Sequence, residues 1–407
     1  MSFPEISRRV EELRDECLRF LIHICSIPAL GPTNQGQGEM EKYHVVREMV
    51  RSLNPDSEVE VHAPDDRVPD GVRPNLLALF HGKDTSRTLW ILTHIDVVPP
   101  GDPSLWDSDP FKPLVKDGFL YGRGVEDNGQ SLAASIFAAR AVKETSGFGI
   151  NVGLALVSDE ETGSLLGLDY VLNQRPDLFK PDDLILVPDA GSEDGDHLEV
   201  AEKHLLQVKF RVRGRQGHAS APHRTKNTLR AAAHLIVELD NALARRFPEQ
   251  NGFYSPPAST FEPTRKDANV PNINTIPGDD VFYMDCRVLP DISLTSVLAE
   301  MRSVAAEVGE RFGVEIFLEE HMKFQAPPPT PADAPVVLAL AQAVQEVYGV
   351  QARPVGIGGQ TVAAFFRKRG LPAVVWEKIV QCAHAPNERI SIENLMGNAK
   401  VFARMMI

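Results

Sequence analysis

Several histidines and carboxylates of this sequence follow short apolar runs, and these residue types can bind a metal ion. In chain order they are His94, the acidic triplet Asp159–Glu161, Asp189 and His384. The four cysteines are widely separated and lack the spacing of a thiolate cluster. Imidazole and carboxylate donors favour zinc, manganese or cobalt over an iron–sulfur site. The pattern therefore predicts a metal centre with nitrogen and oxygen ligands.

The apolar runs indicate how these residues would be brought together. The runs cover residues 89–92, 152–157, 184–187 and, further from its histidine, 373–376. Runs of this length without alternation are typical of strands buried on both faces of a parallel sheet. In open α/β sheets the ligand site lies beyond the carboxyl ends of the strands. We therefore expect the ligands to meet at one edge of a mainly parallel sheet.

Taken one at a time, the motifs leave alternatives open. Asp96 lies two residues after His94 and could orient its imidazole ring, but a structural histidine by itself fits this pair better. Asp127 follows a glycine-rich turn at a predicted helix start, where it could cap the helix or bridge two metals. The triplet Asp159–Glu161 could be a solvated acidic loop. A bound cation would instead relieve the repulsion between its carboxylates, with one Glu on the metal and its neighbour facing a water.

Composition and charge exclude several classes of protein. The 407 residues predict two or three domains, and 43% hydrophobic with 24% charged residues is ordinary for a globular protein. The net charge of −14 argues against nucleic acid or an anionic membrane as a partner. No apolar stretch reaches the roughly 18 residues of a membrane span. The few cysteines and the lack of a secretory segment predict a cytoplasmic protein.

The predicted elements change character along the chain. Strands and helices alternate from about residue 72 to residue 190, which indicates a sheet covered by helices on both faces. From about residue 204, half-exposed strands and amphipathic helices follow. Their predicted positions are 208–212, 280–288 and 314–318 for strands and 227–245 and 294–312 for helices. An opening helix is predicted at 11–21, and the proline-rich segment 251–264 is predicted to be a loop.

These elements predict an α/β protein of two domains. The catalytic domain would be discontinuous, with residues 1–204 and 325–407 on a mainly parallel sheet. Residues 205–324 would form an inserted α+β domain with one exposed sheet face.

Nine motifs occur in an order that resembles one family of enzymes. They are THIDVVP, WDSDPF, YGRGVEDN, SDEETGS, PDAG, GRQGHAS, NINTIPG, DCR and CAHAPNE. The chain from about Phe20 to Phe402 is similar to the metal-dependent amidohydrolases and exopeptidases. These include acetylornithine deacetylase, succinyl-diaminopimelate desuccinylase, carboxypeptidase G and the cytosolic dipeptidases. The resemblance implies two divalent metal ions, zinc first and cobalt or manganese as alternatives, and a homodimer formed through the inserted lid domain.

The resemblance also implies roles for single residues of the catalytic domain. The implied metal ligands are His94, Asp127, Glu161, Asp189 and His384. Asp127 would bridge both metals and form a cis peptide bond to Asn128. Asp96 would orient the ring of His94, and Glu160 would act as the general base.

Further roles are implied in the inserted domain. His218 would polarise the scissile carbonyl, often from the partner subunit, and Asn274 and Arg287 would hold a substrate carboxylate. The chain departs from the family at Gly129-Gln130, where Lys-Gly is usual, and at Gly358–Thr361, where Gly-Gly-Thr-Asp or Gly-Gly-Thr-Ser is usual. These departures concern specificity.

The expected function is metal-dependent hydrolysis of an amide bond in a small, carboxylate-bearing N-acyl amino acid, as in a deacylase or desuccinylase. A dipeptidase or carboxypeptidase acting on short peptides is the enzyme alternative. The alternative outside enzymes is a metal-binding scaffold that has lost catalysis. Glu160 speaks against the scaffold, because a structural site needs no additional uncoordinated carboxylate.

Overall fold

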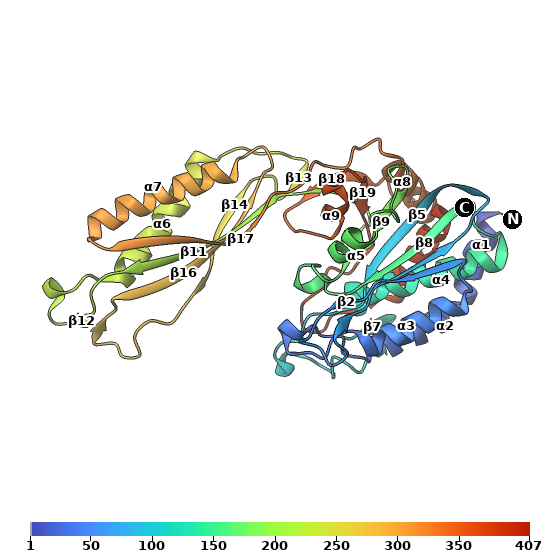
Figure 1. The fold of residues 1–407 in the computed structure, drawn as a ribbon, viewed down its shortest axis with the longest axis horizontal. Helices are drawn as coiled ribbons and strands as arrows, with labels where there is room; N and C mark the ends of the chain where they lie inside the picture. The colour runs from blue at the N-terminus through green and yellow to red at the C-terminus, as the bar shows by residue number, and fades with distance from the viewer. Residues whose placement is uncertain (1) are drawn as a thin grey trace. The chain divides into compact units, whose positions relative to one another are not determined.

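The computed structural model describes residues 2–407 and divides into two compact units (Figure 1). Unit 1 comprises residues 1–200, 328–354 and 361–407, and unit 2 comprises residues 201–327 and 355–360. That unit 1 is a catalytic domain and unit 2 a lid and dimerisation domain remains a prediction.

The sheet of unit 1 has four parallel strands at its centre. In sheet order these are β8 (Ile150–Val157), β5 (Asp84–His94), β9 (Leu184–Val187) and β19 (Ala373–Val375). Antiparallel strands lie on both sides, namely β4 (Leu76–Phe80) and β1 (Ser57–Glu60) beside β8, and β10 (His197–Glu202) beside β19. The four central strands contain the four apolar runs of the sequence, except that Trp376 follows the end of β19. The α/β prediction is confirmed, and the complete sheet is mixed.

Helices cover both faces of this sheet. On one face, α5 (Leu168–Gln174) and α9 (Ala363–Lys368) pack their apolar side chains against strand residues such as Trp90, Val157 and Val187. Helix α4 (Ser131–Thr145) contacts β5 and β8 and packs against α10 (Ile392–Met405) and α1 (Phe3–Glu12). The remaining long helices are α2 (Arg14–Cys25), α3 (Met40–Ser52) and α8 (Pro335–Tyr348).

The opening helix differs from its prediction. Residues 11–21 were expected to form one helix, but α1 ends at Glu12 and α2 begins at Arg14. Leu13 lies between the two helices with 1% of its surface exposed. The apolar stripe that suggested one helix is real, since Leu13, Cys17 and Phe20 are all buried, but the chain turns within it.

A small three-stranded sheet, β6 (Leu114–Lys116), β7 (Phe119–Tyr121) and β20 (Arg389–Ser391), joins two distant segments of unit 1. Strand β7 leads into the glycine-rich turn before Asp127, and β20 follows the segment that contains His384. The two strands are antiparallel, with Arg389 opposite Tyr121. The pairing brings the two segments together although more than 250 positions separate them along the chain.

Unit 2 is an antiparallel sheet with two helices on one face. The strand order is β14 (Thr260–Lys266), β16 (Asp279–Val288), β11 (His204–Arg213) and β17 (Glu315–Phe324). Helices α6 (Thr228–Arg246) and α7 (Leu294–Phe312) enclose a core that includes Phe210, Phe282 and Met301. Both helix predictions are confirmed, α7 with the predicted ends. Short strands β12 (Gly217–His218) and β15 (Thr275–Ile276) pair with each other, and β13 (Tyr254–Ser255) pairs with β18 (Arg353–Ile357).

The prediction of a loop over 251–264 is wrong at the short strand β13 and in its second half, where β14 begins at Thr260. Strand β14 is at the edge of the sheet, and its register shifts between Pro263 and Arg265. Proline is tolerated at an edge strand because no second neighbour needs its missing N–H. The prolines therefore hid a strand. No helix among residues 2–407 is long and apolar enough to cross a membrane.

Candidate metal centre

The five predicted metal ligands come from five separate segments of unit 1 and meet at one edge of its sheet, with His384 in the segment between β19 and β20. His94 is the last residue of β5, Glu161 lies in η4 (Glu160–Thr162) after β8, and Asp189 follows β9. Asp127 lies in η3 (Val125–Gln130), and its peptide bond to Asn128 is cis.

The ligand atoms form two groups that share Asp127. In the first, Nε2 of His94 is 2.8 Å from Oδ1 of Asp127 and 3.1 Å from Oδ1 of Asp189. In the second, Nε2 of His384 is 3.0 Å from Oδ2 of Asp127 and 3.1 Å from Oε2 of Glu161. Each oxygen of Asp127 thus faces a different histidine, which is the arrangement required of a carboxylate that bridges two metals.

The donor set fits two divalent cations. The ligand atoms of each group lie within 4.8 Å of one another, and tetrahedral bonds of about 2.0–2.1 Å would place them about 3.3 Å apart. Oε1 of Glu161 is buried and has no hydrogen-bond partner among residues 2–407. A buried carboxylate oxygen without a partner is costly unless a cation or donor reaches it.

The electrostatics of the cluster also favour a cation. Burial and the neighbouring charge of Asp127 raise the pKa of Glu161 to about 7. Burial and the charge of Asp189 raise the pKa of Glu160 well above its usual range. Hydrogen bonds to Asp127 and Glu161 raise the pKa of His384 to about 10. A bound cation would favour the ionised carboxylates and neutral histidines that metal ligation needs.

Asp96 contacts the acidic triplet as well as the ring of His94. Nδ1 of His94 is closer to the backbone oxygen of Asp96, at 3.1 Å, than to its carboxylate, at 3.6 Å. The Asp96 carboxylate accepts the backbone N–H groups of Glu160 and Glu161, each at 3.1 Å. Asp96 therefore links the end of β5 to the acidic triplet and is a positioning residue.

The three carboxylates of the acidic triplet have three different surroundings. Asp159 turns away from the cluster and accepts hydrogen bonds from the buried Arg73, at 3.2 Å, and from Thr162. Glu161 joins the second ligand group. The Glu160 carboxylate receives no hydrogen bond from any residue in the described range 2–407. Glu160 is therefore the member of the triplet whose carboxylate is free of hydrogen bonds within that range.

Sequence reasoning missed a residue that orients Asp189. Nδ2 of Asn128 donates to the Pro188 carbonyl at 2.6 Å and to Oδ1 of Asp189 at 3.1 Å. The position of Asn128 beside the predicted ligand Asp127 could have marked it as a site residue. Its hydrogen-bond partners, about sixty residues further on, could be identified only from the fold.

Of the three site residues predicted in unit 2, His218 and Asn274 lie together and Arg287 lies apart. His218 and Asn274 are neighbours, because β12 pairs with β15 and the Asn274 carbonyl accepts the N–H of Ala219 at 2.9 Å. Arg287 donates to Oδ1 of Asp285 at 2.7 Å and to the Gly358 carbonyl at 3.1 Å.

Strand β16 separates Arg287 from the other two. The β12–β15 pair lies where β11 and β16 meet at Arg213 and Asp279. The eight steps from Asp279 to Arg287 span about 27 Å at about 3.4 Å per residue of antiparallel strand. One small carboxylate therefore cannot contact both Asn274 and Arg287 of the same chain.

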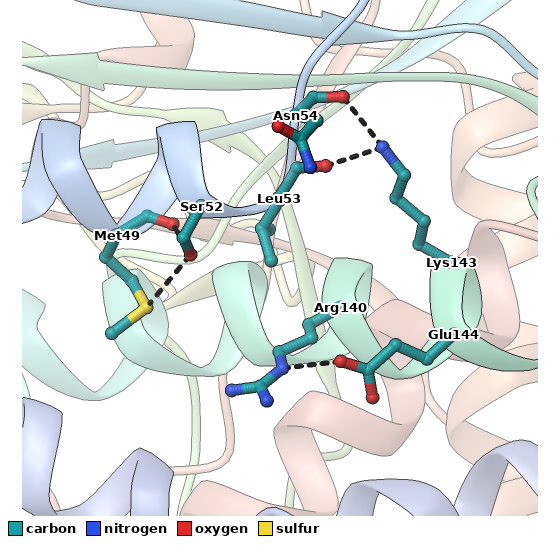
Figure 2. Close-up of a pocket in the computed structure, with 7 residues that line it drawn as sticks. All are labelled: Met49, Ser52, Leu53, Asn54, Arg140, Lys143 and Glu144. Carbon is teal, nitrogen blue, oxygen red and sulfur yellow. Dashed lines mark hydrogen bonds and ion pairs between the residues drawn. The ribbon is translucent and has the colours of Figure 1, made fainter.

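A surface hollow elsewhere on unit 1 contains none of the predicted site residues. Figure 2 shows it between the end of α3 and one side of α4. Lys143 donates to the backbone carbonyls of Leu53 and Asn54, and Arg140 pairs with Glu144. Lys143 binds the carbonyls at the end of α3, and Arg140 is paired with Glu144 on the surface of α4. Neither cation is therefore free to bind a ligand in this hollow.

Comparison with known proteins gives relatives along nearly the whole chain. An uncharacterised metallohydrolase of Methanocaldococcus jannaschii is 36% identical over 411 residues, covering 97% of this chain and 100% of the relative. Succinyl-diaminopimelate desuccinylase of Cereibacter sphaeroides is 30% identical over 339 residues, covering 82% and 86%.

Solved structures share the fold at low sequence identity. Human carnosine dipeptidase 1 has a TM-score of 0.75 at 17% identity and covers 100% of this chain and 99% of its own. A metallo-carboxypeptidase of Sulfolobus solfataricus has a TM-score of 0.72 at 20% identity, with 96% and 98% covered. The model of peptidase family M20/M25/M40 matches residues 90–407, which include every predicted ligand of the cluster. The chain belongs to peptidase family M20/M25/M40 and is a metal-dependent hydrolase.

Proposed function

We propose that this hydrolase cleaves the amide bond of a small N-acyl amino acid that carries a free carboxylate, in the manner of a deacylase or desuccinylase. Glu160 carries the proposal. It is an uncoordinated carboxylate with a raised pKa beside two ligand groups that share Asp127. A structural metal site needs no such group, whereas hydrolysis needs a general base.

In the proposed reaction, the residues of unit 1 bind, orient and move a proton. Divalent metals held by His94, Asp127, Glu161, Asp189 and His384 would lower the pKa of a water and polarise the scissile carbonyl. Glu160 takes the proton of the attacking water and gives it to the leaving amine. Asp96 holds the backbone of Glu160 in place through its N–H. Zinc is the proposed metal, because borderline nitrogen and oxygen ligands suit it.

The substrate carboxylate is assigned to Arg287, whose guanidinium can bind a carboxylate through two hydrogen bonds. Asp285 and the Gly358 carbonyl orient it, and about 31% of its side chain is exposed. Gly358 begins the segment in which this chain departs from the family, so the departure lies beside the proposed carboxylate site. The desuccinylase among the relatives supports an N-acyl substrate with carboxylates.

His218 and Asn274 are proposed to serve the site of a partner subunit in a homodimer. About 27 Å of β16 separates them from Arg287, so residues that approach one small substrate would come from two chains. Residues 211–230 contain six Lys or Arg and no Asp or Glu, whereas unit 1 carries the whole net charge of −14. This contrast supports an approach of the basic β12–β15 end to an acidic ligand cluster.

A dipeptidase or carboxypeptidase is the second proposed function. It is supported by the fold shared with human carnosine dipeptidase 1 and the metallo-carboxypeptidase. Deacylation and peptide cleavage would use the same attacking water and the same general base. The two reactions differ in the group on the acyl side of the amide bond. A cytoplasmic location is part of the proposal, because all four cysteines are free thiols.

A substrate panel tests the function. Protein stripped of metal and reloaded with zinc, cobalt or manganese would be offered N-succinyl and N-acetyl amino acids, their carboxamides and dipeptides. Release of free amine would be measured. We expect turnover of the N-acyl acids, much less of the carboxamides, and none without metal. Turnover of dipeptides alone would favour the second function. Loaded protein that cleaves nothing would contradict both.

A further inference from the structure

In two segments that carry metal ligands, a buried carboxylate of each segment accepts backbone N–H groups of the other. Glu126 immediately precedes the ligand Asp127, and Glu388 follows the ligand His384 by four positions. Their side chains are almost completely buried, with 2% and 0% of the residue surface exposed. Neither residue was singled out by sequence reasoning, and neither belongs to the ligand groups.

The Glu126 carboxylate binds the backbone just before His384. One oxygen accepts the N–H groups of Cys382, at 2.6 Å, and Ala383, at 2.9 Å. The other accepts the N–H of Val380 at 2.7 Å. No Lys, Arg or His in the described part of the chain forms an ion pair with Glu126. The hydrogen bonds that compensate its burial come from segment 380–383, so they tie this segment to the Glu126 side chain.

The Glu388 carboxylate makes the opposite contact. It accepts the backbone N–H groups of Glu126 at 2.9 Å, Asp127 at 3.1 Å and Gly124 at 3.2 Å, and it pairs with the buried Arg123. Glu388 therefore fixes the backbone of Asp127, and Glu126 fixes the backbone that leads to His384. The pairing of β7 with β20 closes the same junction.

His384 depends on its backbone more than the other ligands do. About 54% of its side chain is exposed, compared with 2% for His94. Among the described residues, its ring forms ion pairs only with Asp127 and Glu161. Little packing holds the imidazole, so the position of residues 380–383 decides where its nitrogen lies.

We propose that Glu126 is a positioning residue for the second metal group, Asp127, Glu161 and His384, and acts by fixing backbone segment 380–383. The inference rests on the proposed two-metal function. Loss of Glu126 should weaken that group and spare His94 and Asp189, because Glu388 still holds the backbone of Asp127. Partners of metal ligands typically contribute about 10–100-fold to affinity.

Asp183 provides a matched control. It is 4% exposed, and its carboxylate also accepts three N–H groups, from Thr88 at 2.8 Å, Lys180 at 2.8 Å and the Trp90 indole at 3.1 Å. It lies just before β9, at the end of the strand away from Asp189. Asp183→Asn should therefore lower stability as Glu126→Gln does, without changing metal affinity.

The experiment is a calorimetric titration of metal-stripped protein with Zn²⁺, for wild type, Glu126→Gln and Asp183→Asn. We expect two binding events in wild type and Asp183→Asn. In Glu126→Gln, one event should weaken by about 10–100-fold and the other should be unchanged. Turnover of this variant should recover at high zinc concentration, which a general loss of structure would not allow. Glu126→Asp, which keeps the charge but shortens the reach, gives the same readout if Glu126→Gln does not fold.

Each contrary result has a separate meaning. Two events of wild-type affinity in Glu126→Gln would overturn the positioning role, as would equal weakening in Asp183→Asn. A total of only one bound Zn²⁺ per chain in wild type would overturn the proposed two-metal function itself.

Discussion

Glu160 and Glu161 are adjacent in sequence and share one anchor, the Asp96 carboxylate that accepts both of their N–H groups. Their side chains then diverge. Glu161 lies 3.1 Å from Nε2 of His384, whereas the Glu160 carboxylate has no hydrogen-bond donor within residues 2–407. The same change to an amide should therefore have two different effects.

Glu160→Gln should keep both metals and reduce turnover about 10²–10⁴-fold, the range of general-base catalysis. Glu161→Gln should lower metal content, because an amide is a poor ligand for the second group. Metal content by elemental analysis and turnover would be measured on the same samples. Nearly normal activity of Glu160→Gln would contradict the role of Glu160 as general base. Loss of metal in that variant would indicate that Glu160 is a metal ligand.

At the scale of elements, the parallel strands place the ligands because each ends at the same edge of the sheet. Strand β5 is central to this arrangement, since it ends in His94 and pairs with β8 and β9. Gly153 of β8 lies opposite Trp90 of β5. A Cβ on Gly153 would come within 2.2 Å of the Trp90 ring, and Asp183 and Phe179 hold this ring in place.

Gly153→Ala should therefore destabilise the metal-free protein by about 1–3 kcal/mol, the usual cost of overpacking a core. Urea unfolding would measure the change. Gly252→Ala is the control, because a Cβ there meets nothing within 4 Å, and its effect should stay within about 0.5 kcal/mol. Equal stability of the two variants would show that β5 can move away from β8.

At the scale of the whole molecule, charge is divided unevenly between the units. Unit 2 has 16 basic and 16 acidic residues, so unit 1 carries the entire charge of −14. Within unit 2, five of the six cations in residues 211–230 form no ion pair with a described residue, and His218 lies among them. This supports the proposal that His218 serves the acidic site of a partner chain.

Mixed dimers test that proposal. His218→Ala and Glu160→Gln should each be nearly inactive as homodimers. Mixing them should restore part of the activity, because one site of each heterodimer receives both intact residues. His223→Ala, which changes another exposed histidine of the same segment, should remain active alone. If subunit exchange is demonstrated and no activity returns, His218 acts within its own chain or has no catalytic part.

The sequence by itself determined the ligand types and the strands that carry them. Runs such as 184–187 are buried on both faces, so their composition alone distinguishes them from half-exposed strands such as 208–212. The ordered motifs led to the family that the comparison confirms. Local patterns sufficed here because strand burial and ligand identity are properties of short segments.

Only the tertiary structure decided the contacts between distant segments. Glu126 and Glu388 each bind the backbone of the other's segment, and Asn128 donates to Asp189 sixty-one positions away. Asn274 and Arg287, in contrast, lie far apart although both were predicted to hold the same carboxylate. A buried carboxylate needs N–H donors, but nothing in its own segment says which backbone supplies them. The edge strand β14 was hidden for a related reason, because proline excludes a strand only where two neighbours need its N–H.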